Sequence, residues 1–404
     1  MPASIPIELQ EHLLDFLFND ITTLKECSFV CRAWTPTTRT HIFRKFSAHY
    51  EYDGNDPYKP RCWQYQQEFI HLVGYIREID IQDAAGILLK PENATTNSSD
   101  SELRSLCAIL DLLPSLQRVS VSTKCGSYRR MRSWNQLSIP FSDSLIAALQ
   151  RSSSSLTHVF MYGFFFSALD ASVFLGLPHL EYLGLEAISA TNDGSDNLPP
   201  LPNDSPQSGN LQTLSLYFIY PEIFNGHLID RLISTLQASN LRHLRLAGHA
   251  QISIMEAFPP SWSSSLTHFT LELTDFDTTG GYEAYSPLSP SFIAKLPALH
   301  ALKVLELSLN SGLLNDLSAL ENFLDAMLPG HLDELLITIG ARGPTTSIDT
   351  VRQMYESSLS RAEVVRIQWE DGKLEELEEY YGELFAAGAM EVGHYPWQDH
   401  WISW

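Results

Sequence analysis

One short pattern recurs through most of the chain and constrains its fold more than any other feature. An apolar residue occupies positions 1, 4 and 6 of a segment that returns ten times, with successive first positions 24 to 40 residues apart. Self-similarity at this period is typical of solenoids, whose units are too short to be stable alone and bury their apolar faces against neighbours. The ten first positions are Ile76, Leu116, Leu156, Leu180, Leu211, Leu241, Leu266, Leu302, Leu332 and Ala362.

The spacing within each segment predicts a β-strand. Side chains alternate along a strand, so positions 4 and 6 share the inward face while positions 3 and 5 face the other way. Stretches with helical periodicity separate the segments, at 101–113, 143–150, 228–236, 290–296 and 317–328. Strand, helix and parallel strand in succession give an α/β horseshoe. We therefore predict that residues 71–370 form an irregular α/β solenoid with parallel strands.

The outward strand positions hold the candidate residues for binding a protein target. They combine aromatic rings with Arg and His, a composition enriched at protein interfaces. These candidates are Arg118, His158, Phe160, Tyr182, Tyr217, His243, Arg245 and His268. The three histidines occupy position 3, which leaves two interpretations open: a pH-sensitive or metal-binding column, or simple repetition of Leu-Thr-His and Leu-Arg-His. No column of carboxylates or cysteines accompanies them, so we predict no metal.

Composition excludes several classes of function. The net charge of −22 argues against nucleic-acid binding, which needs a basic face. No run of 18 apolar residues is present to span a membrane. The five cysteines, without a secretory signal, predict reduced thiols in the cytoplasm and/or nucleus. No nucleophile elbow, phosphate-binding glycine loop or zinc-protease motif occurs, so we expect no enzymatic activity, catalytic residue or cofactor.

The two ends of the chain differ from the repeats. Residues 1–50 contain five Lys/Arg and five Asp/Glu, so the excess acid lies beyond them and predicts a domain boundary near residue 50. Residues 51–70 are turn-rich and predict a linker or the start of the solenoid. Residues 371–404 predict an acidic capping helix followed by a tryptophan-rich tail. That tail either packs back on the repeats or docks a partner.

The first fifty residues predict a small helical module. Residues 5–18 have Pro6 in the first turn and Leu9, Leu13 and Leu17 at intervals of four, which indicates an amphipathic helix. Three short helices bury little surface among themselves. The exposed remainder of the apolar stripe therefore needs a partner, in the next domain or in another protein.

The ends of the next two helices are predicted from their capping residues. Thr23 as N-cap and Glu26 three residues later fit a capping box. Pro36 is expected to end this second helix. Thr37 or Thr38 then caps a third helical segment, which is predicted to carry Ile42, Phe43 and Phe46.

The order of these residues resembles the F-box motif, in the form common in fungal proteins. The matching segments are Ile5-Pro6-Ile7-Glu8-Leu9, Leu13-Leu14-Asp15-Phe16-Leu17 and Cys27-Ser28-Phe29-Val30-Cys31-Arg32-Ala33-Trp34. The resemblance implies binding to a Skp-type adaptor and, through it, to a cullin. The implied adaptor contacts are Ile5, Pro6, Leu9, Leu13, Leu17, Leu24, Val30, Cys31 and Trp34.

The repeats are similar to the leucine-rich repeats that follow many F-boxes. The family's asparagine, three residues after the last apolar position, occurs here only as Asn310. Together the two resemblances imply a non-catalytic substrate receptor of a Skp–cullin–F-box ubiquitin ligase. The alternative hypothesis is a scaffolding repeat protein that binds partners without promoting ubiquitination.

Overall fold

The computed structural model divides the chain into two compact units, residues 1–208 and 209–404. Each unit is described by itself below. The structure describes residues 6–50, 70–83, 88, 99–123, 132–133, 137–166, 174, 177–190, 210–218, 240–248, 258–273, 293–294, 298–310, 317–328, 330–340, 353, 357, 361–369 and 390–391.

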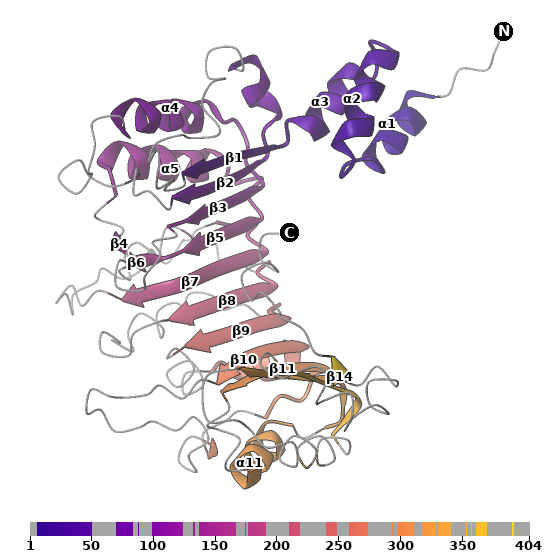
Figure 1. The fold of residues 1–404 in the computed structure, drawn as a ribbon, viewed down its shortest axis with the longest axis vertical. Coiled ribbons are helices and arrows are strands. Elements are labelled where there is room, and N and C mark those ends of the chain that lie inside the picture. The colour runs from indigo at the N-terminus through magenta and orange to yellow at the C-terminus, as the bar shows by residue number, and fades with distance from the viewer. Residues whose placement is uncertain are drawn as a thin grey trace. The chain divides into compact units, whose positions relative to one another are not determined.

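The first unit joins three N-terminal helices to an open sheet of parallel strands (Figure 1). Its helices are α1 (Ile7–Asp15), α2 (Ile21–Val30), α3 (Thr35–Ile42), the 3₁₀ helix η2 (Ile70–Tyr75), α4 (Ser99–Leu112) and α5 (Ile139–Arg151). Its strands are β1 (Lys45–Tyr50), β2 (Glu78–Asp83), β3 (Arg118–Ser122), β4 (Arg132–Ser133), β5 (His158–Tyr162), β6 (Phe164–Phe166) and β7 (Tyr182–Ala190). The strand order is β1-β2-β3-β5-β7, with the short strand β6 pairing both β4 and β7.

The second unit is also built on a sheet of parallel strands. Its strands are β8 (Thr213–Phe218), β9 (His243–Gly248), β10 (His268–Leu273), β11 (Val304–Asn310), β12 (Leu332–Gly340), β13 (Ala362–Trp369) and β14 (Met390–Glu391), paired in that order and all parallel. Its described helices include α9 (Pro260–Ser265) and α11 (Leu317–Met327). The predicted α/β class with a parallel, solenoid-like sheet is confirmed.

The core consists of the repeated apolar positions. All ten first positions, from Ile76 at 7% exposure to Leu116 at 0%, are buried. Every described side chain at positions 4 and 6 is buried as well. The pairing keeps these positions in register, so that Val119 faces both Ile79 and Val159 on its neighbouring strands. The 1-4-6 pattern therefore predicted ten of the strands and their inward face, but not β1, β4, β6 or β14.

The helices beside the sheet follow from amphipathic sequence. In α5, Phe141, Ser144, Leu145, Ala148 and Leu149 are all buried, at the spacing of a single helical face. Helix α4 packs against α5, and Figure 1 draws the two side by side. The predictions for 101–113, 143–150 and 317–328 correspond to α4, α5 and α11. Residues 228–236 and most of 290–296 lie outside the described residues, and the short helix α9 was not predicted.

The predicted caps of the second and third helices are wrong. Asp20, and not Thr23, is the N-cap of α2, and its Oδ1 accepts a hydrogen bond from the Thr23 N–H at 3.0 Å. An aspartate at this position satisfies a free N–H of the first turn, so the helix starts two residues before Thr23. Pro36 lies inside the first turn of α3, where its missing N–H costs nothing.

The predicted end of the helical segment is also wrong. Helix α3 ends at Ile42, and Phe46 lies in strand β1, which pairs with β2. Phe43, Phe46 and Ala48 have the 1-4-6 spacing of the repeats, so the sheet begins at Lys45 rather than beyond residue 50. The acidic segment and the tryptophan-rich tail predicted within 371–404 lie outside the described residues, except for β14.

A ladder of backbone hydrogen bonds runs across the strand starts. The carbonyl at position 2 of a repeat accepts the N–H groups of positions 2 and 3 of the next repeat. Gln117 O, for example, accepts from Thr157 N at 2.9 Å and from His158 N at 3.0 Å. The same double acceptance occurs at Arg44, Arg77, Gln117 and Thr157 in the first unit and at Gln212, Arg242, Thr267 and Lys303 in the second.

Gly163, immediately after β5, has a conformation that other residues rarely adopt. Its φ is +83°, and a Cβ there would lie 2.6 Å from both the carbonyl oxygen and the Oγ1 of Thr123. Thr123 is held at this place because its Oγ1 donates a hydrogen bond to Gly163 O and its N–H donates to Tyr162 O. The glycine therefore fixes the C-terminal end of β5 against β3.

We expect Gly163→Ala to lower the free energy of unfolding of the first unit by about 2–3 kcal/mol, because strain and a steric clash add. The matched control is Gly74→Ala, where an added Cβ meets nothing within 4 Å. Urea-induced unfolding monitored by circular dichroism measures both. Equal stability of the two variants would contradict this account of Gly163.

Candidate protein-binding surfaces

The helices α1, α2 and α3, called the helical module below, have a small internal core. Leu14 and Leu24 are buried at 2% and 0% exposure. The Trp34 indole N–H donates to the Gln10 side chain, and His41 Nε2 lies 2.9 Å from Asp15 Oδ1. Both contacts connect α1 to the region of α3. Helix α1 therefore turns Gln10 and Leu14 inward, and Leu17 is half-buried in the turn that follows it.

The outer surface of the helical module is unusually apolar. Leu9, Leu13 and Phe16 follow one another at helical spacing beside the inward stripe, with 55%, 54% and 73% of each side chain exposed. The full set of exposed large apolar residues in the module is Leu9, Leu13, Phe16, Phe18, Ile21, Phe29 and Val30. Concentrated exposure of large apolar side chains marks a protein-interaction surface. Among the described residues beyond the module, Leu112, Ile139 and Val364 are also exposed.

Most of the adaptor contacts implied by the resemblance are accessible. Pro6, Leu9, Leu13, Val30 and Cys31 are exposed, while Leu17 and Trp34 are half-buried. Ile5 lies outside the described residues.

Leu24 is the exception and needs a correction. It is fully buried because α2 packs against α3. It is part of the core that supports the surface and is not exposed for contact with a partner. The F-box resemblance did not include Phe16, Phe18, Ile21 and Phe29, which are also exposed. In the sequence, these residues could be recognised as apolar side chains that lie off the buried stripe of the helices.

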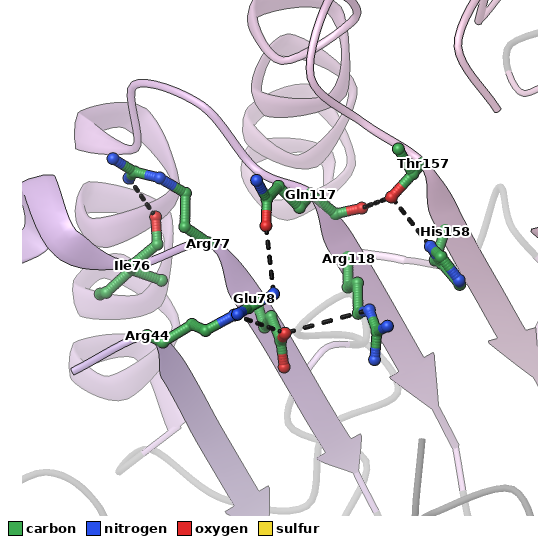
Figure 2. A network of polar contacts seen from close by, with 8 residues as sticks. All are labelled: Arg44, Ile76, Arg77, Glu78, Gln117, Arg118, Thr157 and His158. Atoms are coloured by element: carbon green, nitrogen blue, oxygen red, sulfur yellow. Dashed lines mark hydrogen bonds and ion pairs between the residues drawn. The ribbon is translucent and has the colours of Figure 1, made fainter. Parts of the chain in front are cut away.

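The face of each sheet that carries positions 3 and 5 of the repeats is called the open face below. On the first unit, a polar network surrounds Glu78 at the β1 end of this face (Figure 2). The carboxylate of Glu78 accepts from Arg44 Nε at 2.9 Å and lies 3.9 Å from Arg118 Nε. Arg44 also donates to Gln117 Oε1 at 3.3 Å. Figure 2 shows the carboxylate between the two guanidinium groups. Arg118, a predicted target-binding residue, is therefore oriented by Glu78.

A second carboxylate lies two residues along the same strand. Asp80 is 7% exposed, and its Oδ2 lies 3.6 Å from Lys45 Nζ and 3.6 Å from His49 Nε2. Gln82 also donates to this carboxylate at 3.4 Å. The charges at the β1 end of the open face are thus balanced largely within the unit.

An aromatic cluster lies beside this network. The rings of His158 and Tyr182 stack with centroids 5.7 Å apart and planes 19° apart. Phe160 and Tyr182 fill the space over Gly184, where an added Cβ would be 2.6 Å from Phe160 Cδ2. The strand register thus brings together four predicted residues: Arg118, His158, Phe160 and Tyr182. Aromatic rings beside an arginine are typical of protein-binding surfaces.

Hydrogen bonding fixes the tautomer of His158. Thr157 Oγ1 donates its one proton to Gln117 O at 3.1 Å. The contact of 2.8 Å between His158 Nδ1 and Thr157 Oγ1 must then be donated by the ring. In the neutral ring, Nε2 is therefore a hydrogen-bond acceptor. Burial, and then the charge of Arg118, lower the pKa of His158 from 6.5 to about 4.

The remaining predicted residues lie in the second unit. His243 and His268 are Cα partners on β9 and β10, and their ring centroids are 4.4 Å apart in an edge-to-face arrangement. Arg245 follows on β9 and is half-buried. The side chain of Tyr217 lies outside the described residues. The predicted target-binding residues therefore form one group in each unit.

Comparison with known proteins adds no family assignment. No protein-family model matches the chain, and a search of curated proteins finds no match. Among the described residues, no helix is long and apolar enough to cross a membrane. Within the same part of the chain, no three His, Cys, Asp or Glu side chains gather as metal ligands.

The depressed pKa of His158 makes stability depend on pH. Between pH 4 and 6.5 the unfolded chain binds a proton that the folded chain does not, so stability is lost as pH falls through this window. We expect His158→Gln to flatten this dependence in urea unfolding, while His331→Gln at an exposed position leaves it unchanged. NMR titration of His158 with a midpoint near 6.5 would contradict the assignment.

Proposed function

We propose that this chain is the substrate-recognition subunit of a Skp–cullin–F-box ubiquitin ligase, acting in the cytoplasm and/or nucleus. The helical module binds a Skp-type adaptor and, through it, a cullin. The open faces of the parallel strands bind a protein target. The chain itself performs no chemistry.

The exposed apolar residues of the helical module carry this proposal. Phe29 is 88% exposed and Val30 66%, at the end of the helix that matches the cysteine-and-tryptophan part of the motif. Burial of apolar surface is worth about 25 cal/mol per Å², so covering these side chains supplies a large driving force for association. Leu9 and Leu13, which the F-box resemblance assigns to the adaptor, belong to the same exposed set.

The open faces support the second half of the proposal. The described side chains there include aromatic rings, guanidinium groups and hydroxyls, which suit protein recognition. A receptor of this kind accelerates ubiquitin transfer by holding a target lysine at high effective concentration near the ubiquitin-charged enzyme. In this role, the chain has only to bind the target and to position its lysines.

We expect Leu9→Asp combined with Phe29→Asp to abolish co-purification with the Skp-type adaptor of the same organism. Two carboxylates at an apolar interface cost several kcal/mol unless they find partners. The matched control is Leu112→Asp combined with Ile139→Asp, which introduces two carboxylates at exposed apolar residues outside the module, 50% and 62% exposed. Circular dichroism checks that all three proteins fold.

Two results would count against the proposal. If the double variant binds the adaptor as the wild type does, the exposed apolar residues are not the interface. If the folded wild-type chain does not bind the adaptor, the helical module caps the repeats and the chain is a scaffolding repeat protein.

A further inference from the structure

Two histidine rings meet at the start of β9 and β10 in the second unit, and Arg242 directly precedes the first of them in the sequence. Arg242 and His243 are consecutive and exposed, and the exposed His268 is the Cα partner of His243. Within the described residues, no carboxylate contacts any of these three side chains. Such a group is unexpected in a chain with a net charge of −22.

The described neighbours of the group on the adjacent strands provide Arg242 with no carboxylate partner. On the β8 side, the neighbouring open-face residues are Thr213 and Ser215, which are uncharged. On the other side, Glu306 of β11 accepts from Thr270 Oγ1 at 2.9 Å. Arg245 and Glu272 lie further along β9 and β10. The charge of Arg242 is thus available to an anionic group from outside.

A hydrogen bond to the backbone ladder determines which ring nitrogen of His268 carries the proton. Thr267 Oγ1 donates to Arg242 O at 3.2 Å, so the 2.9 Å contact between Thr267 Oγ1 and His268 Nδ1 is donated by the ring. Nε2 of the neutral ring then has no proton. His268 can donate to an anion through Nε2 only after it takes up a proton.

We propose that Arg242, His243 and His268 form a binding site for an anionic side-chain group of a protein target, a carboxylate or a phosphate in an acidic segment. The identity of the occupant as a target rests on the proposed function. A guanidinium with two imidazoles matches the charge and the acceptor oxygens of either group. Nucleic acid is disfavoured because a run of backbone phosphates needs an extended basic face, whereas this group has one permanent positive charge, that of Arg242.

Binding at this site takes up protons. The pKa of His243 is lowered by partial burial and then by the charges of His268 and Arg242. A bound anion opposes both charge effects and therefore raises the pKa of His243. Proton uptake on binding means that affinity falls as pH rises, by up to about tenfold per pH unit for each proton taken up.

The purified full chain tests the site by NMR of its histidine ring protons. Inorganic phosphate and a hexaglutamate peptide are titrated in separate arms, at mildly acidic and mildly basic pH. The His243 and His268 signals are expected to shift saturably, with tighter binding in acid. Arg242→Gln should weaken binding about tenfold, the size of a lost charge-assisted hydrogen bond.

The matched control is Lys303→Gln. Lys303 occupies position 2 of its own repeat, directly before β11, but its Nζ already lies 3.8 Å from Asp333 Oδ2. This variant should change affinity by less than about twofold. Binding of phosphate alone identifies a phosphorylated side chain as the occupant, and binding of both probes shows that carboxylates suffice.

The proposal is overturned if neither probe shifts these signals. It is also overturned if Arg242→Gln and Lys303→Gln weaken binding equally, because that result indicates general screening of charge. No adaptor is present in these titrations. Their failure therefore leaves the adaptor proposal intact, and loss of adaptor binding leaves the anion site intact.

Discussion

The ladder of shared carbonyls at position 2 is the interaction on which the sheet and its surfaces depend. Each of these carbonyls accepts two N–H groups from the next repeat, so within each unit the start of the strand that follows it is fixed relative to the one before. A slip of one residue would turn the apolar positions 4 and 6 to the open face, which burial strongly opposes. The ladder and the buried side chains therefore enforce the same register.

This register decides which open-face side chains meet. Residues at the same position of neighbouring repeats become Cα partners, so the residue types in that position decide which side chains meet. Glu78 lies beside Arg118, and His243 lies beside His268, for this reason alone. Thr157 and Thr267 extend the effect, because each hydroxyl donates to the ladder and so determines the tautomer of the histidine that follows it. The Leu-Thr-His repetition thus has a structural cause without any metal.

The sequence predicted the structure correctly where a single spacing of apolar residues was present. It predicted the structure wrongly where a helical pattern and a strand pattern overlapped, or where two residues could cap the same helix. The 1-4-6 spacing located ten strands, from β2 to β13, because burial of both apolar positions is obligatory in a stacked sheet; it did not predict the short strands β4, β6 and β14. Phe43, Phe46 and Ala48 carry the same spacing, but they directly follow a helix and were read as its continuation. Thr23 and Glu26 match a capping box, yet Asp20 is the N-cap of α2, because its carboxylate accepts a hydrogen bond from the Thr23 N–H. Which apolar residues of the helical module stay exposed depends on helix packing, which spacing alone does not determine.

The first rung of the ladder joins the helical module to the sheet. Only Phe43 and Arg44 separate α3 from β1. Arg44 O accepts from Arg77 N and Glu78 N, while its guanidinium donates to Glu78 and Gln117. This segment is not a freely rotating linker, because the backbone and the guanidinium of Arg44 are both hydrogen-bonded to neighbouring repeats. Under the proposed function, this short bonded segment connects the adaptor-binding helices to the target-binding face of the first unit. A short connection of this kind raises the effective concentration of a bound target near a bound adaptor.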